Sequence, residues 1–153
     1  MKRFIGATIS FLFLGISTEC SAQTDTSFHS AIFSSGVYGT EAYEEFDFDI
    51  RNGHRDVIEY SYGKKPRTLA LDYKGLDTLD GHPSFNVQFK NGLVLTITPE
   101  KGHLHVSDKK GTYSKIFVWH YEGPINGIGT YCTPCADAEE SMVILEKYFL
   151  LPE

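Results

Sequence analysis

Hydrophobic and polar residues alternate along the chain from Tyr43 onward. This period of two is typical of β-strands that bury one face and expose the other. The alternation runs through residues 46–50, 58–62, 69–73, 85–89 and 93–97, and two further strands are expected within 104–107 and 112–122. Because most of the connections are short, the pattern predicts about seven antiparallel strands in a meander.

Three short turns set the expected strand pairing, each with a basic residue first and a glycine last: Arg51-Asn52-Gly53, Lys90-Asn91-Gly92 and Lys109-Lys110-Gly111. At the second turn, a two-residue loop would pair Lys90 with Leu93 and so place polar against apolar. A three-residue loop instead pairs Phe89 with Leu93 and keeps the apolar residues on one face. The longer loop is therefore predicted.

The same loop length at the other two turns predicts that Phe46 pairs with Ile58 and that Leu104 pairs with Ile116. Residues 74–82 contain several small and polar residues, and they are expected to form a loop between the two halves of the meander.

The period changes near the C-terminal end of the chain. Met142, Leu145 and Phe149 are spaced as on one face of a helix. Thr133 is a suitable N-cap, and Pro134 suits the first helical position. The sequence therefore predicts one amphipathic helix over residues 134–149.

These elements predict a mainly β fold of the α+β class. We expect an antiparallel β-meander that forms a barrel or a strongly curved sheet, with the C-terminal helix packed on it. Residues 43–153 would form this single domain. Residues 23–42, rich in Ser and Thr, are expected to be a loosely ordered N-terminal arm that contributes at most one edge strand.

The first residues have the pattern of a secretory signal peptide. Lys2 and Arg3 precede an apolar run over residues 4–16, which is too short to span a membrane as a helix. Cleavage after Ala22 would remove residues 1–22 and leave a secreted or periplasmic protein. A lipoprotein with Cys20 as its first residue is the alternative, which Glu19 directly before that cysteine disfavours.

The charge balance restricts the classes of partner. The chain has 20 acidic and 14 basic residues, for a formal net charge of −6. An acidic protein repels phosphate backbones and anionic membranes, so nucleic acid is not an expected partner. No second long apolar run follows the leader, so no membrane span is expected in the mature protein.

The sequence Cys132-Thr133-Pro134-Cys135 is the sharpest chemical feature. An exported pair of cysteines normally forms a disulfide, so a structural bridge is expected. Two cysteines at this spacing before a helix are also the arrangement of thiol-disulfide enzymes, because a helix N-terminus lowers a thiol pKa. A thiol-disulfide oxidoreductase or redox sensor that uses Cys132 and Cys135 is therefore the alternative function.

His103 and His105 are the candidate metal ligands, because alternate strand residues share a face. A zinc site needs a third or fourth ligand. The predicted register places His120 on the opposite face, so the third ligand would have to be another residue, such as His54 or His82. We expect no metal and no cofactor.

The remaining candidates surround a glycine-rich loop over residues 123–130 that does not match the dinucleotide-binding pattern. Strand residues before it are bulky on both faces, which indicates burial on both faces or a lined cavity. The candidate ligand or partner patch consists of Phe117, Trp119, Tyr121, Gly127, Gly129 and Tyr131.

No motif for nucleophilic or metal-dependent hydrolysis is present in the sequence. The sequence therefore favours an exported, non-catalytic domain that binds a small apolar ligand or a protein partner. A purely structural component of a cell envelope is an alternative that the sequence does not separate from a binding domain.

Overall fold

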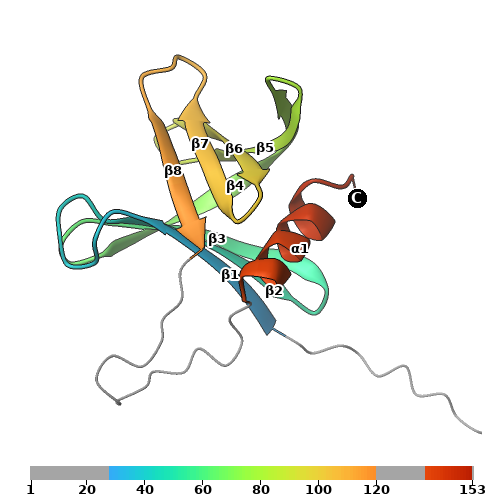
Figure 1. Cartoon of the computed structure of the whole chain (residues 1–153), viewed down its shortest axis with the longest axis horizontal. Coiled ribbons are helices and arrows are strands. Elements are labelled where there is room, and N and C mark those ends of the chain that lie inside the picture. Colours follow the sequence, from blue (N-terminus) through green and yellow to red (C-terminus); the bar gives the residue numbers. More distant parts are fainter. Residues whose placement is uncertain (1–27, 120–136, 153) are drawn as a thin grey trace, which may run out of the picture.

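The computed structural model describes residues 28–119 and 137–152, and this part of the chain forms a closed antiparallel β-barrel with a C-terminal helix (Figure 1). The strands are β1 (Phe28–Ser35), β2 (Glu44–Arg51), β3 (His54–Tyr62), β4 (Arg67–Leu79), β5 (His82–Gln88), β6 (Val94–Glu100), β7 (His103–Asp108) and β8 (Ser114–Trp119); the helix is α1 (Ala138–Phe149). The mainly β fold with a barrel-like meander and one C-terminal helix is confirmed.

Each strand pairs with the next, and β1 closes the barrel by pairing with β8 through Phe33 and Trp119 and through Ser34 and Val118. The expected arm over residues 23–42 thus contains a complete barrel strand. β1 is paired on both sides, and its Ala31 and Phe33 are fully buried. β1 is therefore part of the barrel wall rather than an edge strand.

The predicted pairing around the Lys90-Asn91-Gly92 turn is confirmed. Phe85 pairs with Ile97 and Val87 with Leu95, and the Phe89 amide donates to the Leu93 carbonyl at 2.9 Å. Gly92 has a φ of 88°, the left-handed conformation that this three-residue loop requires.

The predicted pairing of Phe46 with Ile58 is wrong, because the first turn has two residues instead of three. Asn52 and Gly53 both have positive φ, at 53° and 74°, as a type I′ turn requires. A bulge between Phe48 and Ile50 then shifts the register, and Phe48 pairs with Ile58. The bulge keeps the apolar residues of both strands inside the barrel.

The predicted pairing of Leu104 with Ile116 is also wrong, by one residue. The Asp108 carboxylate accepts hydrogen bonds from the amides of Thr112 (2.8 Å) and Tyr113 (3.1 Å) and so holds a longer loop. Leu104 consequently pairs with Phe117. Because a slip of one residue reverses the faces, Phe117 lies in the core while Ile116 and Val118 are 50% and 55% exposed.

The loop expected over residues 74–82 is not present. β4 continues to Leu79 and turns at Asp80 and Gly81, whose φ angles of 50° and 83° match a second type I′ turn. Leu76 is consequently 47% exposed.

The helix starts at Ala138, later than the predicted Pro134, and the Asp137 carboxylate caps it by accepting from the Glu140 amide at 2.9 Å. Thr133 and Pro134 lie outside the described residues. The helix packs across one end of the barrel, and Phe149 enters the core with its ring 5.4 Å from Phe48 and 5.2 Å from Phe85. No helix in residues 28–119 and 137–152 is long and apolar enough to cross a membrane.

The barrel interior is filled with large side chains. The fully buried aromatic residues of this core are Phe33, Phe46, Phe48, Phe85, Phe117 and Phe149. Neighbouring rings meet edge-on, tilted or stacked, for example Phe46 and Phe117 at 5.0 Å. Any ligand site is therefore to be sought at the ends or on the outside of the barrel.

Candidate binding site at the open end of the barrel

The structure describes two of the six residues in the patch that the sequence predicted. Phe117 is completely buried in the core, and Trp119 is half-buried and packed against it. The other members of the patch lie outside the described residues: Tyr121, Gly127, Gly129 and Tyr131. The predicted disulfide or redox pair, Cys132 and Cys135, also lies outside them. A binding site in the described part of the chain would therefore be formed mainly by other residues.

His103 and His105 point outward from β7. The His103 Nε2 atom lies 2.9 Å from the Glu100 carboxylate, and the His105 Nε2 atom lies 2.9 Å from the Ser114 hydroxyl. Within the described residues, no group of three or more His, Cys, Asp or Glu side chains is arranged to hold a metal. The predicted pairing of Leu104 with Ile116, which placed His120 on the opposite face from His103 and His105, is wrong. His120 itself lies outside the described residues.

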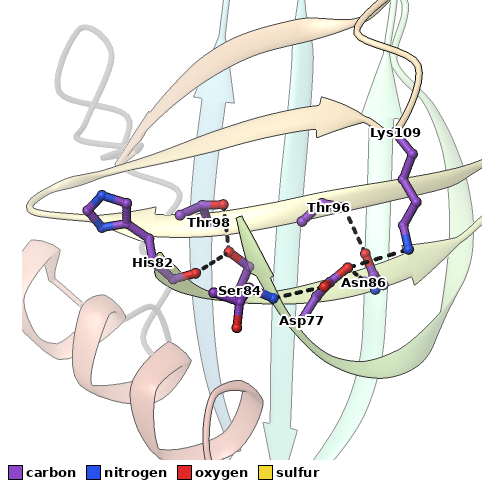
Figure 2. Close-up of polar contacts among 8 residues, drawn as sticks. Asp77, His82, Ser84, Asn86, Thr96, Thr98 and Lys109 are labelled. Carbon is purple, nitrogen blue, oxygen red and sulfur yellow. Dashed lines mark hydrogen bonds and ion pairs between the residues drawn. The ribbon is translucent and has the colours of Figure 1, made fainter. Parts of the chain in front are cut away.

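A polar network crosses the outer faces of β4, β5 and β6 (Figure 2). The Asn86 amide donates to Asp77 at 2.8 Å and accepts from the Thr96 hydroxyl at 2.8 Å. Hydrogen bonding from Asn86 and the Thr78 amide, with the nearby charge of Lys109, holds the pKa of Asp77 below its ordinary value. This network links β4, β5 and β6, and the Asn86 amide and the Asp77 carboxylate are both occupied by hydrogen bonds within the protein.

The same face brings Ser84 near His82, but not as a nucleophile and a base. The Ser84 hydroxyl donates to the His82 carbonyl at 3.0 Å, and the imidazole points away from it (Figure 2). Ser84 is also fully buried and lies 2.8 Å from the Thr98 hydroxyl. Activation of a serine requires contact with the ring nitrogen, which is missing here.

The path of β4 creates two gaps in the wall of the barrel. Its first part, Arg67 to Leu71, pairs only with β3, and its second part, Asp72 to Leu79, pairs only with β5. The first part therefore has a free edge toward the turn between β5 and β6. The start of β3 has a free edge on the other side, near α1.

The helix covers the gap beside the start of β3. The Arg55 guanidinium lies 4.1 Å from the Tyr73 ring centre and donates to the Tyr148 carbonyl, while the Tyr73 hydroxyl donates to the Phe149 carbonyl at 3.0 Å. These donors satisfy carbonyls at the C-terminal end of α1. We call this side, with the turns at 52–53, 80–81 and 101–102, the closed end.

The opposite end, with the turns at 36–43, 63–66, 89–93 and 109–113, has no helix over it among the described residues, and we call it the open end (Figure 1). Aromatic rings line its entrance. Tyr60 is stacked on Tyr62 at 5.7 Å and meets Phe89 edge-on at 5.3 Å. This layer separates the filled core from solvent.

Glu44 anchors the polar side of the open end. Lys115 and the Tyr113 hydroxyl both donate to its carboxylate. Partial burial raises the pKa of Glu44, but hydrogen bonds from Lys115, Tyr113 and Tyr60 and the charge of Lys115 outweigh burial and leave it below its ordinary value. Burial and this carboxylate raise the pKa of Tyr60 and of Tyr113. Glu44 is thus a firmly ionised, engaged carboxylate, which is unsuited to act as a general base near neutral pH.

Two neighbouring hollows lie at the open end. The apolar gap, of about 280 Å³, is lined by Thr68, Leu69, Ala70, Phe89, Lys90 and Asn91. The second hollow, of about 530 Å³, is lined by Glu41, Tyr62, Gly63, Lys64, Lys65 and Arg67. The two hollows meet at the start of β4. Arg67 of the second hollow and Leu69 of the first are alternate residues of this strand and therefore lie on the same face, so a cationic surface adjoins the apolar one.

Sequence reasoning missed this site for two reasons. The apolar gap depends on where β4 changes partners, and no local pattern marks that residue. The basic run from Lys64 to Arg67 is visible in the sequence, but the net charge of −6 describes the whole chain and does not reveal a local positive cluster.

A groove at the closed end is larger but of different character. It has a volume of about 650 Å³ between α1 and the β6–β7 turn. Its apolar lining comes mainly from Pro99, Met142, Val143 and Leu150. Three acidic residues and one lysine also line it: Glu100, Glu139, Glu146 and Lys101. This groove combines an apolar floor with acidic residues.

A further unusual group is Asp47, on the outer face of β2. Burial, with the charges of Asp49, Glu45 and Glu59, raises the pKa of Asp47 to about 7, although the Ser30 hydroxyl donates to it. Among the described residues, one oxygen of the neighbouring Asp49 is buried without a hydrogen-bond partner. Both groups lie among other carboxylates, and such a cluster alone does not make a site.

A barrel of this kind hosts many unrelated functions, so its shape alone assigns none. Comparison with protein-family models, with curated protein sequences and with solved structures found no match.

Proposed function

We propose that the chain is a non-catalytic binding domain that takes a small ligand with an apolar body at the open end of its barrel. The observation that carries this proposal is the apolar gap at Leu69, Ala70 and Phe89, next to a free strand edge. Leu69 remains 42% exposed there, although it belongs to the inward-facing set of β4.

The filled core supports a site at the entrance rather than inside the barrel. An interior ligand would have to displace packed phenylalanine rings, and emptying such positions costs about 3–5 kcal/mol each. The gap of about 280 Å³ is near the lower limit for small-molecule sites, which are typically about 300–1,000 Å³. It therefore suits the apolar part of a small ligand.

A binding role is also supported by the hydrogen bonds and the burial of the polar groups that could otherwise act in catalysis. Glu44 is engaged by three donors, and Ser84 is buried and directed at a carbonyl. Neither arrangement leaves a base poised beside an accessible nucleophile.

The test uses the neutral fluorophore N-phenyl-1-naphthylamine and the variant Leu69→Gln. Saturable binding is expected for the unaltered protein, with about tenfold weaker binding for the variant, because one methylene-scale apolar contact is worth about 1–3 kcal/mol. Ile116→Gln is the matched control, since it changes an equally exposed apolar residue away from the gap. No saturable binding, or equal weakening by both variants, would overturn the proposal.

Export remains part of the proposal. Cleavage of residues 1–22 would deliver the domain to the periplasm or outside the cell, where Cys132 and Cys135 would form a disulfide. Intact mass of the exported protein, before and after alkylation, tests both. The redox alternative predicts a reduction potential between about −120 and −270 mV, whereas a structural bridge lies below about −300 mV.

A protein partner is the second candidate, and the groove beside α1 favours it. Glu100, Glu139 and Glu146 complement a partner segment that is apolar and flanked by Lys or Arg. A synthetic Leu/Lys peptide is expected to bind the protein, and Val143→Lys to abolish that binding, because it places a cation on an exposed apolar residue of the groove. Unchanged peptide binding by this variant would exclude the groove as the docking site.

A further inference from the structure

We infer that the ligand of the open end is an anionic amphiphile, whose carboxylate or phosphate is held by Lys64, Lys65, Arg67 and Lys90. We call these four residues the cationic lip. The inference rests on the proposed function, because it names the chemical class of the ligand that the apolar gap receives.

The position of the cationic lip next to the apolar gap is the first support. Lys64, Lys65 and Arg67 line one hollow, and Lys90 lines the other with Leu69 and Phe89. Both hollows include the start of β4, so a ligand with its apolar part beside Leu69 has cations within reach on two sides. The combination of an apolar wall and convergent charge is the usual composition of a small-molecule site.

The second support is that the described part of the chain provides no partner for these charges. None of the side-chain hydrogen bonds, ion pairs or ring contacts among the described residues involves a side chain of the cationic lip. Some other cations do have partners, such as Arg51 with Asp56 at 2.7 Å and Lys109 with Asp77 at 3.5 Å. The cationic lip is thus free to bind an external anion.

Among the described residues that line the two hollows, one is acidic and four are cationic. Glu41 lines the second hollow, and it is one carboxylate against three cations there. Glu44 is committed to Lys115, and Asp108 accepts hydrogen bonds from the amides of its own turn. In a chain of net charge −6, such a local excess of positive charge marks a specific surface rather than the average composition.

The residue types match a carboxylate or a phosphate. The guanidinium of Arg67 can bind either group through two parallel hydrogen bonds, and the lysines add charge without fixed geometry. The apolar gap has room for only part of a ligand, so a short acyl or alkyl chain with one anionic group fits better than a bulky neutral molecule.

The experiment compares ligands that share one chain and differ in the head group: decanoate, decyl phosphate, decyl maltoside and decyltrimethylammonium. Each is titrated below its micelle concentration by displacement of N-phenyl-1-naphthylamine. The two anions are expected to bind about tenfold more tightly than the maltoside, since a charge-assisted hydrogen bond is worth about 1.5–3 kcal/mol. The cation should bind most weakly, and added salt should reduce the preference for anions.

Variants assign that preference to the cationic lip. The double variant Lys64→Gln/Lys65→Gln and the single variant Arg67→Gln should bind anions and maltoside with nearly equal affinity. Lys74→Gln, an exposed lysine of β4 that lines neither hollow, is the control and should keep the preference. Thermal unfolding of each variant verifies that these exposed substitutions leave the fold intact.

The outcomes separate the two proposals. Equal binding of the maltoside and the anions by the unaltered protein would overturn the anionic class and leave the apolar site standing. Failure of every decyl compound to bind would overturn both. Displacement of decyl phosphate by inorganic phosphate at similar concentration would show a site for free anions and overturn the amphiphile.

Discussion

The two ends of the barrel are built from the same meander, yet they differ in what covers them. At the closed end, α1 fills the gap left by β3, and Arg55 and Tyr73 bind the carbonyls of its last residues. At the open end, the matching gap beside β4 is left as a hollow. Leu69 is exposed there, and the surrounding cations have no partner among the described residues. A single strand that changes partners thus makes two openings. The residues around one opening hold the helix, and those around the other leave a hollow where we propose that a ligand binds.

The largest expected effect is at the closed end, with Phe149→Ala. Phe149 is fully buried against Phe48, Phe85 and Tyr73, so its truncation should lower the free energy of unfolding by about 3–5 kcal/mol. Urea denaturation measures this loss. Phe89→Ala, at the partly open gap, is the comparison and should cost less; equal losses would contradict the division of roles between the ends.

The next largest effect on stability is expected for Asp47→Asn, in the barrel wall between the two ends, and this effect depends on pH. The pKa of Asp47 is raised to about 7 in the folded protein, above its value of about 3.9 in the unfolded chain, so folding favours the protonated form. The stability it contributes is complete below about pH 4 and is lost as pH rises through about 7.

Asn is neutral at every pH, so the variant should be more stable than the unaltered protein above pH 7, by about 2–4 kcal/mol. The difference should disappear near pH 4. Thermal unfolding across this range measures it, with Asp72→Asn, the same substitution at an exposed position, as the matched control. A constant difference at all pH values would contradict the burial of a titrating Asp47.

Glu44→Gln tests the polar side of the open end and has the opposite sign. The folded pKa of Glu44 is lowered, so its contribution to stability is present above the ordinary value of 4.5 and is lost as pH falls through the folded value. Near neutral pH the variant should lose about 1–3 kcal/mol, because Lys115 and Tyr113 lose a charged acceptor. Its difference from the unaltered protein should shrink in acid, and growth of the difference in acid would exclude the ionised carboxylate.

The smallest effect compares two hydroxyl groups. Tyr73→Phe removes the bond to the Phe149 carbonyl and should cost about 0.5–1.5 kcal/mol in unfolding free energy. Tyr62→Phe, at the open end, should change stability by less, since Tyr62 is 36% exposed. Chemical denaturation of the two variants side by side checks the order, and a larger loss for Tyr62→Phe would reverse it.

Periodicity was sufficient for the fold and for the Phe89–Leu93 hairpin, because alternation with a three-residue loop admits only one register there that keeps apolar residues together. It failed at the third turn, because the Asp108 side chain stabilises a longer loop that no count of apolar residues reveals. The continuous β4 was missed although Asp80-Gly81 is a strong hairpin signal.

The candidate site was harder to predict than the fold. The sequence pattern around Trp119 predicted a binding patch that included Phe117. Phe117 lies in the core instead, because the predicted pairing of its strand was wrong by one residue. The open end depends on residues far apart in the chain, such as Leu69 and Phe89, which meet only because β4 leaves its pairing with β3 at Leu71.

The most direct test of the central claim maps binding onto the two ends by NMR. Decanoate is titrated into isotope-labelled protein, and backbone amide shifts are followed. If the ligand binds at the open end, the shifts will concentrate in residues 62–70 and 89–93. Shifts concentrated instead in residues 99–102 and 138–150, around the closed-end groove, would contradict the proposal.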